Sequence, residues 1–305
     1  MQVELRTAPA FAKANGIELC YDTFGDPKAP PMILIMGLAT QMIAWDEEFC
    51  ALLAGHGFFV VRFDNRDIGL STRIERAGVP NVQAAFMAAM QGKPVEAPPY
   101  LLTDMADDVA GLMDALGIEA AHIVGASMGG AIAQTLAIHH PERLLSLTSI
   151  MATSGAPELP PPSPEALAML FKPTPTDQAG YLESYAQTYR VLRAGSFPLD
   201  EARDRSRAER NFARGLNPPG VARQLVAILA SGSRKERLRN VRAPTLVIHG
   251  TVDPLVHPMG GRDTAASIPG AKLLMIEGMG HALPISMWPQ ITDAIATHAK
   301  DSDAP

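Results

Sequence analysis

The stretch HIVGASMGGAIAQ, from His122 to Gln134, places one serine among small residues where two sequence patterns meet. The apolar run before Ser127 is typical of a buried β-strand, and the Ala- and Ile-rich run after it is typical of a helix. A turn that lifts one hydroxyl clear of a sheet brings backbone so close that side chains two residues away would clash. Gly125 and Gly129 meet that requirement, so this G-x-S-x-G pattern predicts an exposed, strained serine.

Strand and helix patterns alternate on both sides of this turn. Amphipathic helix patterns occupy residues 45–57 and 102–117, with three aspartates in the first turns of the second helix, where the helix dipole favours anions. The strand patterns are residues 16–25, 31–37, 58–64, 121–127, 144–151, 244–250 and 271–278. This order predicts an α/β fold with a mostly parallel, doubly wound sheet and helices on both faces.

The stretch from residue 153 to residue 240 breaks the alternation, because it has helical patterns and no buried strand. We interpret it as a helical cap inserted between two strands, so that residues 1–152 and 241–305 form the two parts of one core domain. Its arginines interleave with acidic residues, which favours a solvated helix surface over a nucleic-acid-binding face. These acidic residues are Glu201, Asp204, Glu209 and Glu236.

A second irregular segment runs from Ala77 to Tyr100 and contains the short apolar pattern QAAFMAAM. A helix without a polar face needs a cover. We therefore expect this helix to pack under the insertion or to line a pocket.

Composition limits the classes of function. The 305-residue chain is 47% hydrophobic and 19% charged, as soluble globular proteins are. Its formal net charge of −6 gives no broad attraction to nucleic acid or an anionic membrane, so we expect neither as a partner. The sequence shows no export signal and no apolar run of the ~20 residues that a membrane helix needs. We expect a cytoplasmic protein, with a homo-oligomer compatible with the sequence.

Two further expectations concern cysteines and cofactors. Cys20 and Cys50 are predicted to be reduced core residues, because two scattered thiols without an export signal rarely pair. There is no Cys/His cluster at metal-ligand spacing and no phosphate-binding glycine loop. We therefore expect neither a metal nor an organic cofactor.

A serine hydroxyl needs a base to become a nucleophile, and the base needs an orienting acid. His281 follows the last strand pattern in a Gly-flanked loop, and Asp253 follows the strand pattern before it. Active groups collect at the carboxyl ends of parallel strands, so Ser127, Asp253 and His281 are expected to meet there. The alternative bases are His249 and His257, and the alternative acids are Asp263 and Glu277.

An oxyanion formed beside the serine needs N–H donors. The backbone N–H of Met128 opens the predicted helix and faces that position. The N–H of Leu38, in the turn after the 31–37 strand, is the expected second donor if Gly37 allows close approach.

These features resemble the α/β-hydrolase superfamily, and within it most closely the esterases related to aclacinomycin methylesterase. One departure is Met36-Gly37, where most relatives carry His-Gly, so a polar role for that histidine is absent here. The segment from Ala77 to Tyr100 is also longer than usual. The motifs that carry the resemblance are MGLA (36–39), FDNRDIGLST (63–72), GASMGG (125–130), HPERLLSLTSI (140–150), PTLVIHGTVDPLV (244–256) and GMGHALP (278–284).

The resemblance implies a nucleophile at Ser127, an acid at Asp253, a base at His281 and oxyanion N–H groups at Leu38 and Met128. We expect a carboxylic ester hydrolase acting on a small-molecule ester and water, with a hydrophobic ester favoured by the Met-rich flanks. A lactonase, a C–C bond hydrolase or a perhydrolase would use the same three residues. A catalytically silent ligand-binding protein on this fold is the alternative from another class.

Overall fold

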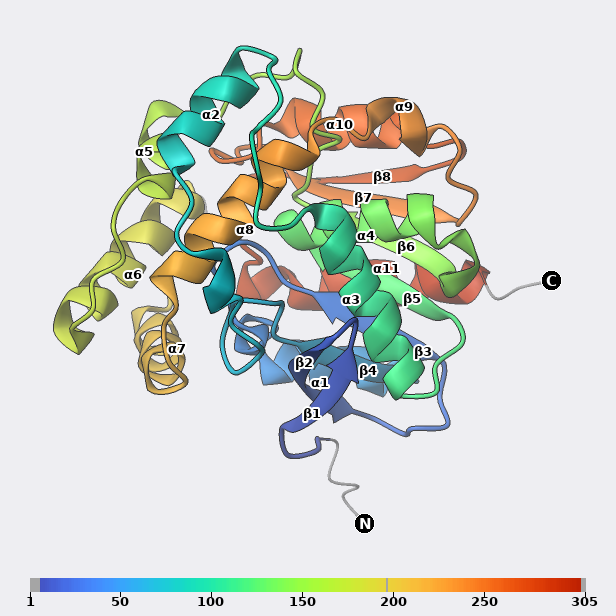
Figure 1. Cartoon of the computed structure of the whole chain (residues 1–305). Coiled ribbons are helices and arrows are strands. Elements are labelled where there is room, and N and C mark those ends of the chain that lie inside the picture. Colours follow the sequence, from blue (N-terminus) through green and yellow to red (C-terminus); the bar gives the residue numbers. More distant parts are fainter. Residues whose placement is uncertain (1–5, 196, 303–305) are drawn as a thin grey trace.

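The structure is a computed structural model that describes residues 6–195 and 197–302 (Figure 1). In this part of the chain one sheet has the strand order β1-β2-β4-β3-β5-β6-β7-β8. β2 runs antiparallel to β1 and β4, and the other neighbours are parallel, so the predicted mostly parallel sheet is confirmed. The strands are β1 (Ala10–Ala14), β2 (Ile17–Phe24), β3 (Pro31–Ile35), β4 (Phe59–Phe63), β5 (Ala121–Ala126), β6 (Leu144–Ile150), β7 (Thr245–Gly250) and β8 (Lys272–Ile276).

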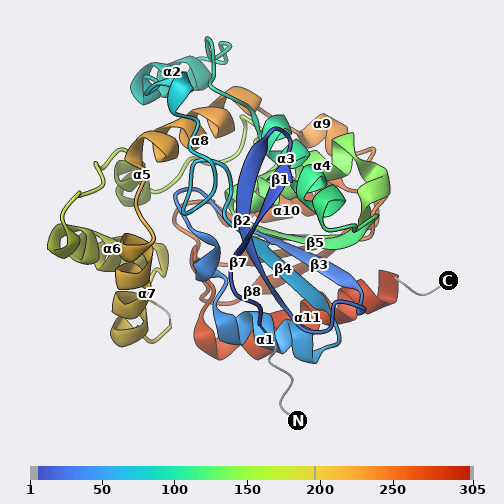
Figure 2. The same cartoon turned by 60° about the horizontal axis from the view of Figure 1, so that its bottom comes forward.

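Helices cover both faces of the sheet, which explains the continuous apolar strands. α3 (Leu102–Ala115), α4 (Met128–His139) and α10 (Pro258–Ser267) lie on one face, and α1 (Glu47–Gly55) and α11 (Trp288–Ser302) lie on the other (Figure 2). Each face has its own large apolar cluster. Every residue of β5 and β7 is buried, as expected for strands covered on both sides.

Both cysteines are free and buried, as predicted. Cys50 packs in the cluster under α1 and α11, and burial is the largest cause that raises the pKa of its thiol to about 12. Burial likewise raises the pKa of the Cys20 thiol to about 11. Neither thiol is therefore a ready nucleophile at neutral pH.

Among the described residues, five helices lie between β6 and β7: α5 (Pro164–Leu170), α6 (Gln178–Leu192), α7 (Glu201–Ala213), α8 (Pro218–Ser231) and α9 (Lys235–Leu238). The helices α5, α6 and α7 lie away from the faces of the sheet in both views (Figures 1 and 2). The short α9 instead packs against α4 and α10 of the core. The division into a core and a cap at residues 153 and 240 stays a prediction.

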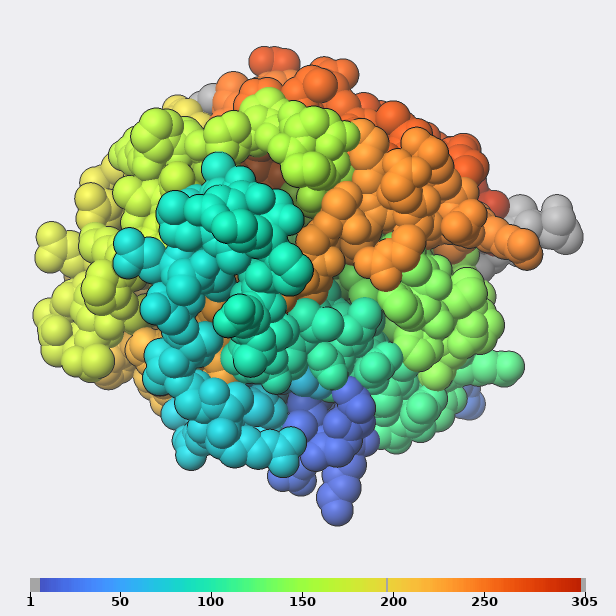
Figure 3. Space-filling view, turned by 45° about the horizontal axis from the view of Figure 1, so that its top comes forward, coloured from blue at the N-terminus to red at the C-terminus, as the bar shows by residue number. Residues whose placement is uncertain are grey.

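The apolar helix α2 (Val82–Met90) is less covered than expected. It packs on α8, and the ring of Phe86 meets that of Phe171 edge-on with centroids 5.2 Å apart. Met87 and Met90 are 50% and 66% exposed, and Figure 3 shows α2 in teal on the molecular surface. The expectation that this helix packs against the insertion is confirmed in part, because α8 and Phe171 cover one side of it and the other side stays exposed.

The hairpin of β1 and β2 is absent from the sequence-based prediction, which begins its strands at residue 16. Ala14 pairs with Ile17, so Asn15 and Gly16 form a two-residue turn, both with positive φ (48° and 78°). Asn-Gly is a strong hairpin signal, and it would have revealed β1.

Short 3₁₀ turns complete the described elements: η1 (Met42–Ala44), η2 (Glu75–Ala77), η3 (Pro141–Arg143) and η4 (Ile285–Met287). Within residues 6–195 and 197–302, no helix has the length and apolar character to cross a membrane.

Candidate active site

Ser127 occupies the turn between β5 and α4, where the sequence predicts it. Its backbone has φ 56° and ψ −122°, a region that residues with a side chain rarely adopt. The residues on either side are buried, and Ser127 is the partly exposed one. The strain therefore holds the hydroxyl up from the end of the sheet.

Gly125 and Gly129 make this turn sterically feasible. A Cβ on Gly125 would collide with the carbonyl oxygen of Gly129, and a Cβ on Gly129 would collide with the carbonyl oxygen of Ile35. Both collisions are with backbone, which cannot move aside as a flexible side chain can. The small residues of the motif are thus a packing requirement of the turn.

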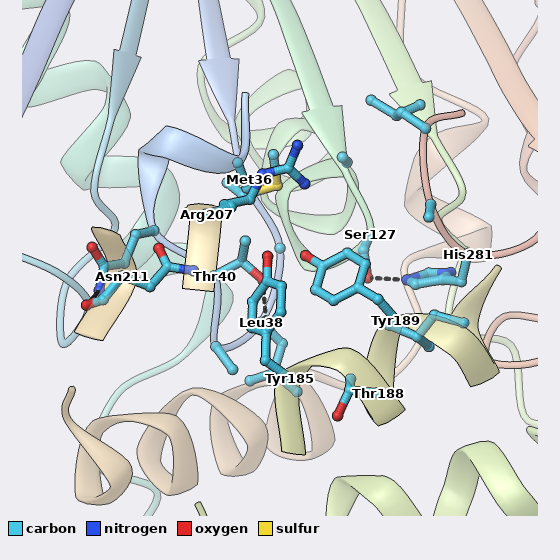
Figure 4. Close-up of a pocket in the computed structure, with 18 of the residues that line it drawn as sticks. Met36, Leu38, Thr40, Ser127, Tyr185, Thr188, Tyr189, Arg207, Asn211 and His281 are labelled. Atoms are coloured by element: carbon cyan, nitrogen blue, oxygen red, sulfur yellow. Dashed lines mark hydrogen bonds between the residues drawn. The ribbon is translucent and has the colours of Figure 1, made fainter. Parts of the chain in front are cut away.

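The structure brings Ser127, His281 and Asp253 together. The Oγ of Ser127 lies 2.9 Å from Nε2 of His281, and Nδ1 of His281 lies 2.7 Å from Oδ2 of Asp253 (Figure 4). A carboxylate can only accept, so Nδ1 carries the proton and donates it to Asp253. Nε2 is then left to accept the hydrogen bond of the Ser127 hydroxyl.

Asp253 is held as a carboxylate. Burial alone would raise its pKa, but the neighbouring His281 and hydrogen bonds from His249, His281 and the Val256 N–H bring the pKa well below its usual range. Its Oδ1 accepts the N–H groups of Leu255 and Val256, at 2.9 and 2.8 Å. One oxygen is therefore fixed by the loop, and the other faces His281.

The alternative histidines lie elsewhere. His249 is fully buried beside Asp253, with Nε2 at 2.9 Å from the carbonyl oxygen of Val256 and 3.5 Å from Asp253. His257 is exposed and accepts the Met259 N–H at the start of α10. His281 alone of these three contacts Ser127 in the described part of the chain.

The alternative acids do not approach His281. Asp263 pairs with Lys235 at 2.6 Å and accepts the hydroxyl of Ser154 at 2.5 Å. Glu277 is exposed. Among the three acids considered, Asp253 is the one whose carboxylate accepts a hydrogen bond from His281 in the described part of the chain.

The two expected oxyanion donors flank Ser127. Gly37 packs so closely that a Cβ there would lie 3.0 Å from the Cβ of Ser127, which places the Leu38 turn directly against the serine. Met128 is the first residue of α4. Neither the Leu38 nor the Met128 N–H finds an acceptor among the described residues. Both are therefore free to bind an oxygen that approaches the serine.

Gln224 of α8 holds the turn that carries Leu38. Its Oε1 accepts the N–H of Ala39 at 3.2 Å, and its Nε2 donates to the carbonyl of Arg66 at 2.8 Å. Gln224 is fully buried, and Ala39 has a positive φ of 61°. The sequence offers no signal for this contact, since the two partners lie 185 residues apart.

Residues 30–286 match the family described as alpha/beta hydrolase fold. The chain belongs to the α/β-hydrolase family. It is 32% identical to the rhodomycin D methylesterase DnrP of Streptomyces peucetius over 93% of this chain and 95% of that protein. The rhodomycin D methylesterase DauP of Streptomyces sp. (strain C5) gives the same values. The predicted resemblance to the methylesterase group is confirmed.

Solved structures show the same fold. A meta-cleavage product hydrolase of Pseudomonas fluorescens IP01 superposes with a TM-score of 0.75 at 20% identity, covering 96% of this chain and 98% of that chain. Together, the family match and the named relatives support hydrolase activity for this chain.

In this α/β hydrolase a cavity of about 330 Å³ lies over Ser127 and His281. A volume of this order suits a small-molecule ligand. Helices α5 to α8 supply much of its wall, and the apolar part includes Met36, Leu38, Met151, Met169 and Trp288. None of the described residues from 77 to 100 lines it, so of the two alternatives for the α2 segment the structure supports packing against the insertion, not lining this cavity.

The arginines between β6 and β7 were predicted to lie on a solvated helix surface, and the structure places only some of them there. Arg205 is exposed as expected and pairs with Glu209. Arg207, however, is 9% exposed at its side chain and lines the cavity, where it lies 3.3 Å from Asp46. The prediction fails there because the α7 face that carries Arg207 docks on the core.

One wall of the cavity is aromatic and was not predicted from the sequence. Tyr181, Tyr185 and Tyr189 line the cavity from α6, with the Tyr185 and Tyr189 rings stacked at 4.5 Å between centroids. Their four-residue spacing places them on one helix face and is the signal that could have indicated them. Figure 4 shows Tyr189 close to Ser127 and Tyr185 further along the pocket.

Proposed function

We propose that the protein is a serine carboxylesterase that uses Ser127, His281 and Asp253. The observation that carries the proposal is the unbroken chain of contacts, 2.9 Å from Ser127 to His281 and 2.7 Å from His281 to Asp253. Such a relay activates a hydroxyl that is otherwise a poor nucleophile. Elbow glycines Gly125 and Gly129 support it by fixing the serine in place.

The proposed reaction has two steps. His281 takes the proton of Ser127 as Oγ attacks the ester carbonyl, and the N–H groups of Leu38 and Met128 bind the negative charge that forms on the carbonyl oxygen. His281 then protonates the leaving alcohol and an acyl-enzyme remains. A water molecule then gives a proton to His281 and attacks the acyl carbon, and His281 returns that proton to the Oγ of Ser127 as the carboxylic acid leaves. Asp253 keeps the imidazole in the required tautomer throughout.

The proposed substrate is a small-molecule ester with an apolar portion. The two relatives DnrP and DauP are methylesterases by name, which supports a methyl ester, and the methionines of the cavity suit an apolar group. The proposal includes a cap formed by residues 153–240 over the site and a cytoplasmic location.

Activity on a substrate panel tests this function. Purified protein would be assayed on methyl esters of increasing acyl length, a lactone, a vinylogous diketone, and hydrogen peroxide with a carboxylic acid. The expected result is turnover of the methyl esters above the other classes. A preference for the lactone, the diketone or perhydrolysis would assign the same residues to that reaction instead. No turnover of any class would favour a ligand-binding protein.

Asp253→Asn is expected to lower kcat by about 10⁴-fold. The asparagine Oδ1 would still accept the loop N–H groups of Leu255 and Val256, so its NH₂ group must face His281. The Nδ1 atom of His281 would then accept a hydrogen bond from the asparagine, so the imidazole proton would lie on Nε2. A protonated Nε2 cannot accept the hydrogen bond of the Ser127 hydroxyl. The matched control is Asp263→Asn, which removes a carboxylate outside the relay and is expected to keep kcat. Equal losses in both variants would contradict the role of Asp253.

Gln224→Met is expected to lower kcat by about 10–100-fold, with a smaller change in KM. Methionine fills a similar volume but cannot hold the N–H of Ala39, so the turn that carries Leu38 loses its anchor. Initial rates measured over a range of concentrations of one methyl ester would give kcat and KM separately. Gln83→Met, an exposed change on α2, is the control. A change in KM alone would show that Gln224 does not act through the oxyanion donors.

A further inference from the structure

The main chain of His281, the proposed base, is held by helix α6. The backbone N–H of His281 donates to the carbonyl oxygen of Leu192 at 2.6 Å. Leu192 is the last residue of α6, and the last carbonyl groups of a helix have no partner within the helix. This contact therefore gives a helix-end carbonyl its partner and fixes the main chain of the base at the same time.

Gly280, the residue before His281, allows this contact. A Cβ on Gly280 would collide with the carbonyl oxygen of Leu192 and with the carbonyl group of Arg193. Both are backbone groups, which could move aside only if the end of α6 moved. Gly280 does not have a positive φ, so the missing side chain serves the close approach of α6 and not the conformation of the loop.

The C-terminal end of α6 lies at the active site. In Figure 4, Tyr189 lies nearer to His281 than Tyr185 does, so the helix approaches the relay with its C-terminal end. Leu192 and Arg193 line the cavity together with His281. The end of α6 is thus both a part of the cavity wall and a support for the base.

An ion pair fixes this end of α6 to α7. The guanidinium of Arg193, the residue after Leu192, donates to both carboxylate oxygens of Asp204, with Nη2 2.6 Å from Oδ1. The two side chains are only 14% and 9% exposed, so solvent and salt screen this pair less than a surface pair. A bond with two prongs fixes the direction of the guanidinium as well as its distance.

Helix α7 is in turn tied to the core. Arg203 and Arg207 of α7 lie 3.1 and 3.3 Å from Asp46, whose side chain caps the start of α1. A continuous series of contacts therefore runs from the core through α7 and Arg193 to the N–H of His281.

We propose that the C-terminal turn of α6 positions the base, and that the Arg193–Asp204 pair keeps the Leu192 carbonyl on the N–H of His281. The inference rests on the proposed esterase function and adds two positioning residues to it. Arg193 and Asp204 act through the main chain of His281. A small shift of His281 costs rate, because proton transfer depends on its 2.9 Å contact with Ser127.

Arg193→Met removes the ion pair and keeps a long side chain. It is expected to lower kcat on a methyl ester by about 10–100-fold, with a smaller change in KM. The matched control is Arg190→Met, on the same helix, where the side chain is 64% exposed and kcat is expected to stay. A change in KM with kcat unchanged would show that Arg193 serves substrate binding and would overturn the proposal.

Asp204 gives an independent test, because it does not line the cavity over Ser127. Asp204→Leu is expected to lower kcat about as much as Arg193→Met, and the double variant no further than either, since both residues act through one contact. The double variant leaves no buried charge unpaired, so its thermal midpoint should exceed that of Asp204→Leu. An unchanged kcat in Asp204→Leu, or losses that multiply in the double variant, would overturn the proposal.

Gly280→Ala separates α6 from the base and leaves the ion pair itself unchanged. The new Cβ would displace the Leu192 carbonyl, so kcat is expected to fall by about 10–100-fold. Gly55→Ala is the control, because a Cβ there meets nothing within 4 Å. Wild-type kcat in Gly280→Ala would show that the base does not need α6.

Hydrogen exchange separates this inference from the proposed function, since it needs no turnover. The amide proton of His281 would be followed by NMR in wild type, Arg193→Met and Arg190→Met. We expect protection in wild type and Arg190→Met, and exchange about 10-fold or more faster in Arg193→Met. If wild type hydrolyses no ester but shows this difference, the esterase proposal fails and the positioning of His281 stands. An unprotected wild-type amide, or equal protection in Arg193→Met, would overturn the inference even in an active esterase.

Discussion

Ser127→Ala is expected to lower kcat on a methyl ester by on the order of 10⁶-fold while the chain stays folded. The change removes the one atom that forms the acyl bond. The hydroxyl's hydrogen-bond partner is His281, so little packing depends on it. Measurement needs a long-time product assay by chromatography, together with thermal unfolding to show that the midpoint stays near that of wild type.

The control is Ser206→Ala, which changes an exposed serine on α7 and is expected to keep full activity. Residual activity of Ser127→Ala within a factor of a few of wild type would show that another residue, or water itself, attacks the ester. Loss of activity together with unfolding would instead show a structural role for the elbow serine.

His281→Ala is expected to reduce kcat about as much as Ser127→Ala, again on the order of 10⁶-fold. Without Nε2 at 2.9 Å, the hydroxyl keeps its proton and attacks slowly. The matched control is His257→Ala, an exposed histidine in the neighbouring loop, which is expected to keep its activity.

The double variant Ser127→Ala/His281→Ala makes this test sharper. Residues that act as one unit lose activity together, so the double variant should be no slower than either single one. Losses that multiply would mean that the two residues act independently, and the relay would then be wrong.

The sequence predicted the elements that position the site because chain order and strand ends carry that information. Ser127, Asp253 and His281 each follow a buried strand, and parallel strands bring their carboxyl ends to one edge. The close approach of Gly37 to Ser127 was the condition set from the sequence for the Leu38 donor, and the structure meets it because Gly37 has no side chain.

The parts that could not be predicted depend on how the insertion docks. Arg207 belongs to a run of charged residues that is typical of a solvated helix. It is buried against Asp46 because α7 packs on the core at that point. Conversely, α2 is apolar yet stays half-covered, because α8 offers only one face to it. The local sequence pattern does not determine which faces of these helices contact distant parts of the chain.

The central claim is that Ser127 is a nucleophile activated by His281, and covalent labelling tests it most directly. Wild type and His281→Ala would be treated with a fluorophosphonate at neutral pH and analysed by intact mass and peptide mapping. The account predicts one adduct per chain, on Ser127, in wild type and its loss in His281→Ala. An unlabelled wild-type serine, or equal labelling of both proteins, would contradict it.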